Sequence, residues 1–345
     1  YVKQSQFHVF GVTTIIIALI TYCMAPIVAT QPSWFYVMVV VTVLLLTELK
    51  HTFTEFAQRM KNDEMITLAK FLAISGIILP MLPHKNLIPD INLTPYSIWL
   101  ATVVVSGISY LSYLLKRYVF HESGTLVSGI IGGLYSSTAT ISVLARKSRK
   151  ASEQEATDYV AAMLLAVSMM FLRFMILILI FSREIFLSIY PYLLTMAVVA
   201  AIVAWFIHSR QKRPEDQPAE TEEDDSSNPL EFKVALIFAV LFVIFTFLTH
   251  YTLVYAGTGG LNLLSFVSGF SDITPFILNL LQNTGSVAAL IITACSMQAI
   301  ISNIMVNMFY ALFFAGKGSK LRPWILGGFG VVITCNLVLL LFFYI

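Results

Sequence analysis

The chain has 345 residues, of which 58% are hydrophobic and 12% are charged. Soluble domains carry about 25% charged residues, so this composition excludes an ordinary soluble protein. The net charge of +2 gives no reason to expect nucleic-acid binding. Apolar runs of about 20 residues recur along the whole length, which predicts transmembrane helices rather than the alternating segments of a β-barrel. The expected fold class is an all-α polytopic membrane protein.

Most of the apolar segments are continuous enough to form complete transmembrane helices. In chain order they are residues 8–30, 34–50, 65–83, 95–116, 155–182, 185–208, 231–255, 285–315 and 323–345. Two further segments, 122–145 and 258–282, are interrupted by glycine and by hydroxyl or acidic residues. Residues 209–230 are charged, contain proline and lack aromatic residues, which predicts a linker with little order.

The basic residues predict the topology, because they gather on the cytoplasmic side of a bacterial membrane. If segment 122–145 crossed the membrane, the clusters before and after it would lie on opposite faces. If it enters and leaves on one face, all the clusters and the linker 209–230 are cytoplasmic, and the flanks of 258–282, which lack lysine and arginine, are outside. The clusters are Lys50/Arg59/Lys61, Lys116/Arg117, Arg146/Lys147/Arg149/Lys150, Arg210/Lys212/Arg213 and Lys317/Lys320/Arg322. We therefore expect both interrupted segments to be re-entrant.

The two interrupted segments resemble each other in sequence and in position. At one constant offset, without a gap, the matching pairs are Gly124 with Gly260, Gly133 with Gly269, and Thr138 with Thr274. Each segment follows one long apolar span and precedes two more. The expected topology makes the first span of each half run in opposite directions, as in the inverted repeats of many secondary transporters. We therefore predict a duplicated core, each repeat having three transmembrane helices and one broken or re-entrant segment.

Three stretches resemble a known family. "GGLYSSTATISVLARKSR" (132–149), "ILPMLP" (78–83) and "SGFSDITPF" (268–276) resemble the uncharacterised C-terminal membrane domain of MgtC/SapB-type proteins, over roughly 64–345. "GVTTIIIAL" (11–19) resembles the back part of the MgtC/SapB module itself. The resemblance implies a bacterial inner-membrane protein, linked to magnesium or another small ion. Since the chain begins at Tyr1 rather than Met, we expect the front part of that module upstream.

These observations divide the chain into five parts. The expected parts are a helical module (1–64), a connecting helix with an outer loop (65–94), the first repeat (95–208), the cytoplasmic linker (209–230) and the second repeat (231–345). "SSTAT" (136–140) also resembles the Ser-Asn-Thr hairpin tips of divalent-anion/sodium symporters, with Ser137 where asparagine would stand.

Small and hydroxyl residues at membrane depth have two explanations. They allow close helix packing, or they mark a broken helix whose main-chain groups line a cavity. Half-helix N-termini attract anions, whereas unwound carbonyls and hydroxyls attract cations, so the sign of a bound ion stays open. The predicted substrate-binding residues are Ser136, Ser137, Thr138, Thr140, Ser271, Asp272, Thr274, Arg173 and Asn303.

Two charges in apolar segments are functional candidates. Asp272 is costly to keep ionised there, and it is also the one candidate metal ligand; a structural acid is the alternative. Arg173 keeps its charge, so it must reach the interface or meet an anion, a carbonyl or Asp272. Asn303 and Asn307 lie four residues apart on one helix face, where interhelical hydrogen bonds are expected.

The function expected is transport of a small ion by a secondary transporter or gated channel, through a midplane site where the broken segments meet. A cation such as Mg²⁺ is favoured because of the family's association with magnesium. The alternatives are a small-anion transporter and a non-transporting regulator that binds another membrane protein. No nucleophile–base pair points to an enzyme, and no cofactor is expected, with Mg²⁺ or Na⁺ open as transported or coupling ions. The expected partners are the lipid bilayer and the small ion. Whether the protein forms a homodimer is left open.

Overall fold

The computed structural model describes residues 12–32, 35–45, 62–88, 91, 93–120, 124–149, 153–210, 232–282, 288–316, 319 and 321–344. Apart from loops and one isolated bridge between Ile88 and Ile91, these residues are helical, which confirms the all-α class. The chain divides into two compact units, Tyr1–Met65 and Ile66–Ile345, which are described separately.

The first unit contributes two apolar helices to the described residues. They are α2 (Val12–Thr30) and the helix Phe35–Leu45. Pro26 lies inside α2, where it lacks the N–H that would continue the hydrogen-bond ladder. The predicted spans 8–30 and 34–50 extend into residues outside the described ranges.

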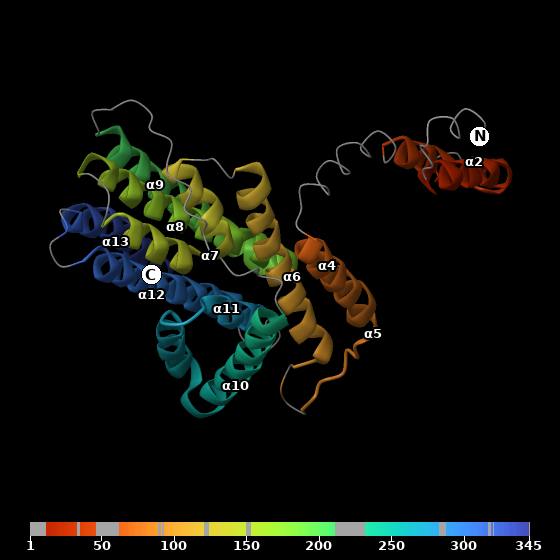
Figure 1. Cartoon of the computed structure of the whole chain (residues 1–345). Helices are drawn as coiled ribbons and strands as arrows, with labels where there is room; N and C mark the ends of the chain where they lie inside the picture. The colour runs from red at the N-terminus through yellow and green to blue at the C-terminus, as the bar shows by residue number, and fades with distance from the viewer. Residues whose placement is uncertain are drawn as a thin grey trace. The chain divides into compact units, whose positions relative to one another are not determined.

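The second unit is a bundle of long apolar helices (Figure 1). From α4 onward the helices are α4 (Asn62–Ala73), α5 (Leu79–Met81), α6 (Pro95–Leu114), α7 (Thr125–Lys147), α8 (Glu153–Phe181), α9 (Arg183–Ser209), α10 (Phe232–Ser268), α11 (Ile273–Gln282), α12 (Ala289–Ala315) and α13 (Arg322–Tyr344). Two π-helical turns, Ile74–Ile78 and Leu115–Val119, follow α4 and α6. Within the described ranges, eight helical stretches are long and apolar enough to cross a membrane. Most of the predicted spans are therefore confirmed.

Polar residues define where the helices α6 and α9 begin. Thr94 and Ser97 form a reciprocal capping box, with Ser97 N–H donating to Thr94 Oγ1 at 2.9 Å, and Pro95 occupies the first helical position of α6. Ser182 breaks the apolar run between α8 and α9, and its hydroxyl accepts the N–H of Ile185 at 3.3 Å. Such caps satisfy main-chain donors that have no intrahelical acceptor.

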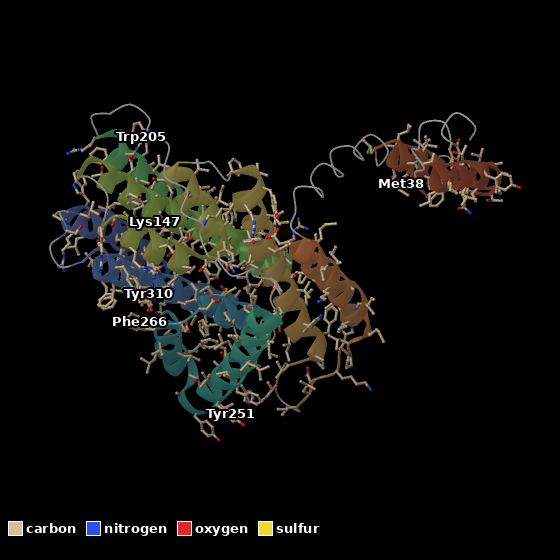
Figure 2. All side chains as sticks on the ribbon, viewed as in Figure 1. Met38, Lys147, Trp205, Tyr251, Phe266 and Tyr310 are labelled. Carbon is tan, nitrogen blue, oxygen red and sulfur yellow. The ribbon has the colours of Figure 1, made fainter. Side chains whose placement is uncertain are left out.

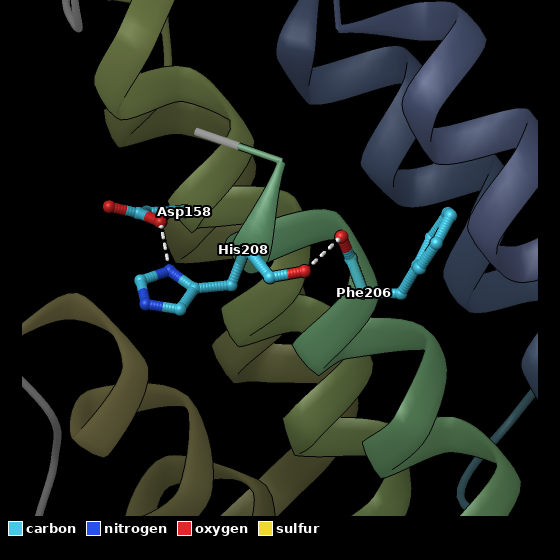
Figure 3. A network of polar contacts seen from close by, with 4 residues as sticks. Asp158, Phe206 and His208 are labelled. Carbon is cyan, nitrogen blue, oxygen red and sulfur yellow. Dashed lines mark hydrogen bonds and ion pairs between the residues drawn. The ribbon is translucent and has the colours of Figure 1, made fainter. Parts of the chain in front are cut away.

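Helices α8 and α9 form an antiparallel pair. His208 Nδ1, near the end of α9, lies 2.7 Å from Asp158 Oδ1, near the start of α8 (Figure 3). Further along the pair, the buried Ser168 hydroxyl donates to the carbonyl of Ala197 at 2.7 Å. These contacts place the start of α8 and the end of α9 at one end of the bundle.

Helix α12 is the most buried of the long helices and packs against α7, α9, α10, α11 and α13. Its last carbonyls, Phe313 O and Phe314 O, accept hydrogen bonds from Arg149, the former at 3.2 Å from Nη2. Arg146 also lies over the Phe314 ring, at 5.1 Å from the centroid. Since Arg149 comes just before α8, the end of α12 lies close to the start of α8.

We predict that Arg149→Ala destabilises the protein by about 1 kcal/mol, because it removes a cation from the negative end of the α12 dipole and leaves two carbonyls without donors. Thermal unfolding of the purified protein in detergent measures this as a lower midpoint. Arg183→Ala is the matched control, since Arg183 is exposed at the first residue of α9. Equal midpoints for the two variants would show that the Arg149 contact contributes nothing.

Candidate functional site

The first break lies in the middle of α7. Ser136 has extended backbone angles (φ −160°, ψ 108°), and its hydroxyl accepts the N–H of Ala139 at 3.3 Å. A Cβ placed on Gly132 would lie 2.5 Å from Thr140 Oγ1. Eight residues of straight helix rise about 12 Å, so this contact requires the chain to fold back at Ser136. Helix α7 is therefore two arms lying side by side, and Ser136 is the N-cap of the second arm.

Two glycines of the first arm explain how closely it packs on α8. A Cβ on Gly129 would lie 2.3 Å from Ala162 O, and one on Gly133 would lie 2.5 Å from Ala166 Cα. Main-chain atoms cannot move aside as a flexible side chain can, so neither position has room for a side chain. Because Gly129 faces Ala162 and Gly133 faces Ala166, the first arm of α7 runs parallel to the start of α8.

The second break follows a bend in α10. Gly257 has φ 59° and ψ −151°, a region that favours glycine, and it separates the arms 232–256 and 258–268, which diverge in Figure 1. Figure 2 shows Tyr251 on the first arm and Phe266 on the second. After a turn at 269–271, Asp272 Oδ1 accepts the N–H of Thr274 at 2.9 Å. Asp272 therefore caps the N-terminus of α11.

Polar side chains of α12 hold the second break. The Ser302 hydroxyl donates to Phe266 O at 2.7 Å, and Asn303 Nδ2 donates to Gly269 O at 3.2 Å. Asn307 Nδ2 donates to Asn303 Oδ1 at 3.1 Å. A Cβ on Gly269 would lie 2.3 Å from Ser302 Cβ, so this glycine is in tight contact as well. Of the two asparagines predicted on one helix face, Asn303 thus bonds to the main chain at the break, and Asn307 bonds to the Asn303 side chain.

Arg173 of α8 connects the first break to the second by charge. Its Nη1 donates to Tyr135 O, immediately before the break at Ser136, at 2.9 Å. Its Nε is buried and has no hydrogen-bond partner within the described part of the chain. The Asp272 carboxylate acts electrostatically on the guanidinium, but these two described residues form no direct ion pair. Arg173 is therefore fixed to a carbonyl, with Asp272 as its more distant counter-charge.

The predicted site residues differ in how far they enter this arrangement. Thr140 packs against Gly132 within α7 itself, and the exposed Ser271 donates to Ser268 O at 3.1 Å. Ser137, Thr274 and Asn303 are buried, Ser136, Thr138 and Arg173 are partly buried, and Asp272 is exposed. For the predicted metal ligand Asp272, the described part of the chain offers no group of three or more His, Cys, Asp or Glu residues placed to hold a metal ion.

Several polar contacts in the core were not predicted from the sequence. Asn279 of α11 donates to Thr246 Oγ1 of α10 at 2.6 Å, and the Tyr192 hydroxyl bonds to Asn336 Oδ1 between α9 and α13. Buried asparagines in apolar runs are the signal that could have found them. The acceptor of Arg173, Tyr135 O, is a main-chain atom, so no residue type in the sequence indicates it.

The helix lengths, the hydropathy and the two interrupted segments define a multi-pass helical membrane protein. The chain belongs to the family described as Domain of unknown function (DUF4010), whose match covers residues 103–315 and so includes both breaks and Arg173. This match agrees with the expected uncharacterised membrane domain. The relation of residues 1–64 to MgtC/SapB proteins stays a prediction.

One curated relative is similar over 64% of the chain. It is an uncharacterised protein of Aquifex aeolicus (strain VF5), 24% identical over 227 residues, which are 64% of this chain and 96% of the relative. No solved structure matches the chain.

Proposed function

We propose that this protein is a secondary transporter that moves a small anion through a site between the two helix breaks. One observation carries the proposal. The partly buried guanidinium of Arg173 bonds to the first break and is within electrostatic reach of Asp272 at the second. A helical arm starts at each break, and helix N-termini and an arginine both favour anions.

An internal duplication is supported by matching contacts in the two halves. The offset of 136 residues that pairs Gly133 with Gly269 also pairs the two N-caps, Ser136 and Asp272. It further pairs Ala166 and Ser302, the residues that each glycine contacts. In both halves, the helix after the break donates a side-chain hydrogen bond to a carbonyl at the break.

The packing between the halves follows the same correspondence. In it, α6 is equivalent to the first arm of α10, and α7 is equivalent to the second arm of α10 together with α11. Helix α8 is equivalent to α12, and α9 is equivalent to α13. Helix α7 packs on α12 as α11 packs on α8, and α9 packs on α12 as α13 packs on α8. Helices α6 and α10 pack on each other, and so do α9 and α13. Since the end of α12 lies close to the start of α8, this arrangement favours inverted repeats, which place the substrate site near the bilayer midplane.

The same geometry supports a re-entrant α7. Its first arm runs parallel to the start of α8, and its second arm returns to Arg146 and Arg149 beside that start. Both ends of α7 then lie on one membrane face, together with Lys116 and Arg117. The positive-inside bias makes that face cytoplasmic.

We predict that cysteines placed at Gly124 and Lys147 are labelled from the same membrane face. A Cβ at Gly124 meets nothing within 4 Å, and Lys147 is at least partly accessible at the end of α7 (Figure 2). Arg183→Cys, in the turn between α8 and α9, is the control for the opposite face. The measurement is reaction with an impermeant maleimide in oriented vesicles. Labelling of Gly124→Cys and Lys147→Cys from opposite faces would rule out a re-entrant α7.

The geometry favours an anion as the substrate. The sequence had favoured a cation, because the family it resembles is associated with magnesium. Asp272 uses one carboxylate oxygen to cap α11, and its charge is opposed by Arg173, so a cation would meet a nearby permanent positive charge. Magnesium sites also depend on carboxylate oxygens with retained waters, and Asp272 is not joined by a cluster of such ligands among the described residues.

A flux panel in liposomes containing the purified protein tests the proposal. We expect uptake of at least one small anion above that of empty liposomes, and none of Mg²⁺ or Na⁺ alone. Uptake of Mg²⁺ without any anion flux would favour the cation transporter instead. The absence of every flux, with folded protein in the liposomes, would favour the non-transporting regulator.

A further inference from the structure

Resting on the proposed anion transport, we infer that the substrate carries a carboxylate or a similar group with two adjacent oxygens, and that Arg173 binds this group through Nε and Nη2. The inference concerns the chemical class of the anion, which the proposed function leaves open. It depends on which edge of the guanidinium is already used in the structure.

When one terminal nitrogen of a guanidinium donates a hydrogen bond, the group still has a second edge, formed by Nε and the other terminal nitrogen. Arg173 Nη1 donates to Tyr135 O at 2.9 Å, which fixes the plane of the group against the first break. The Nε–H and one Nη2–H point to the other side, where they form a fork. Among the described residues, neither Nε nor Nη2 has an acceptor, and Nε is completely covered by protein atoms.

A buried charged donor without an acceptor is unfavourable, so this fork favours a bound partner. The Asp272 carboxylate does not fill it, since its Oδ1 accepts the Thr274 N–H and the two side chains form no ion pair. The only described interaction of Asp272 with Arg173 is electrostatic at longer range. The fork therefore has no acceptor among the described residues, and because Nε is covered by protein atoms here, an oxygen pair from outside the chain reaches it only when the helices around Arg173 separate during transport.

The shape of the fork decides which anions suit it. Two parallel N–H donors match the two oxygens of a carboxylate or of a phosphate-like group, and such bidentate pairs are stronger and more selective than single contacts. A halide ion is spherical and has no pair of oxygens, so the parallel direction of the two N–H donors does not make it bind more selectively. Lysine keeps the charge but offers no planar fork, so Arg173→Lys separates the charge from the geometry.

The test is competitive uptake into liposomes by the wild-type protein and by Arg173→Lys, with formate, acetate, inorganic phosphate, chloride and bromide. We expect the wild type to prefer at least one oxyanion over chloride by tenfold or more. We expect Arg173→Lys to keep chloride uptake and to lose that preference by tenfold or more. Arg183→Lys, at an exposed arginine of α9, is the matched control and keeps the wild-type preference.

A wild type that takes up chloride or bromide as well as every oxyanion overturns the inference while leaving anion transport standing. An Arg173→Lys protein that keeps the oxyanion preference overturns it as well, because the fork is then dispensable. If Arg173→Lys fails to fold in detergent, the wild-type preference alone decides. The absence of all anion uptake removes the proposed function and the inference together.

Discussion

Gly133→Val is expected to abolish the accumulation of folded protein in the membrane. A Cβ at this position would lie 2.5 Å from Ala166 Cα and 2.7 Å from Ala166 O, both of them main-chain atoms that a rotamer change cannot move. The first arm of α7 would have to separate from α8, at a cost of about 3 kcal/mol or more. The separation would also pull Tyr135 O away from Arg173. Detergent-solubilised yield and size-exclusion chromatography measure the loss.

Gly330→Val is the matched control for this substitution. Gly330 also lies inside a transmembrane helix, α13, but a Cβ there meets nothing within 4 Å. The control carries the same change from glycine to a β-branched residue in a helix, without the collision. Yields of Gly133→Val and Gly330→Val that are equal would contradict the tight contact. Gly269→Val is expected to behave like Gly133→Val, because its Cβ would collide with Ser302.

Asp272→Asn is expected to bind the anion more tightly but to transport it at least tenfold more slowly. Asparagine keeps the acceptor that caps Thr274 N–H, so α11 should stay folded. The substitution removes the negative charge that acts on Arg173, and the site becomes more positive. Removing one charge at this range, with the effective dielectric constant of a protein interior, changes the binding free energy of the anion by about 1–2 kcal/mol, which is roughly tenfold in affinity. Slower release then limits turnover.

Equilibrium binding of a radiolabelled anion and liposome uptake, measured on the same preparation, test this prediction. Asp272→Glu is the control, since it keeps the charge but lengthens the side chain that makes the cap. Weaker anion binding in Asp272→Asn would show that the carboxylate assists binding rather than opposing it. That result would favour a cation or a proton as part of the bound species.

Most of the helix positions could be predicted from the sequence because hydropathy is a local property. The apolar run 155–182 became α8, and the interruption at 132–140 became a break at Ser136, since glycine and hydroxyl residues weaken a helix locally. The predicted division between 231–255 and 258–282 coincides with the bend of α10 at Gly257. The chain breaks a second time after Ser268, inside the predicted interrupted segment 258–282.

The composition of the site was also visible in the sequence, but its connections were not. Asp272 and Arg173 stood out because a charge in an apolar run is costly wherever the chain places it. Their direct pairing was one of several options, and the structure instead joins Arg173 to Tyr135 O and leaves Asp272 to cap α11. Both choices depend on which main-chain groups the breaks leave free, a property that composition does not contain.

By itself, the sequence determined that this is a helical membrane protein with two interrupted segments, because apolar length, charge and glycine content act over a few residues. Only the tertiary structure decided that α7 folds back on itself at Ser136 and that Asn303 holds the carbonyl of Gly269. The tertiary structure alone also shows that no described residue supplies an acceptor for the Nε of Arg173. These features depend on contacts between residues far apart in the chain, and many different packings satisfy the same hydropathy pattern.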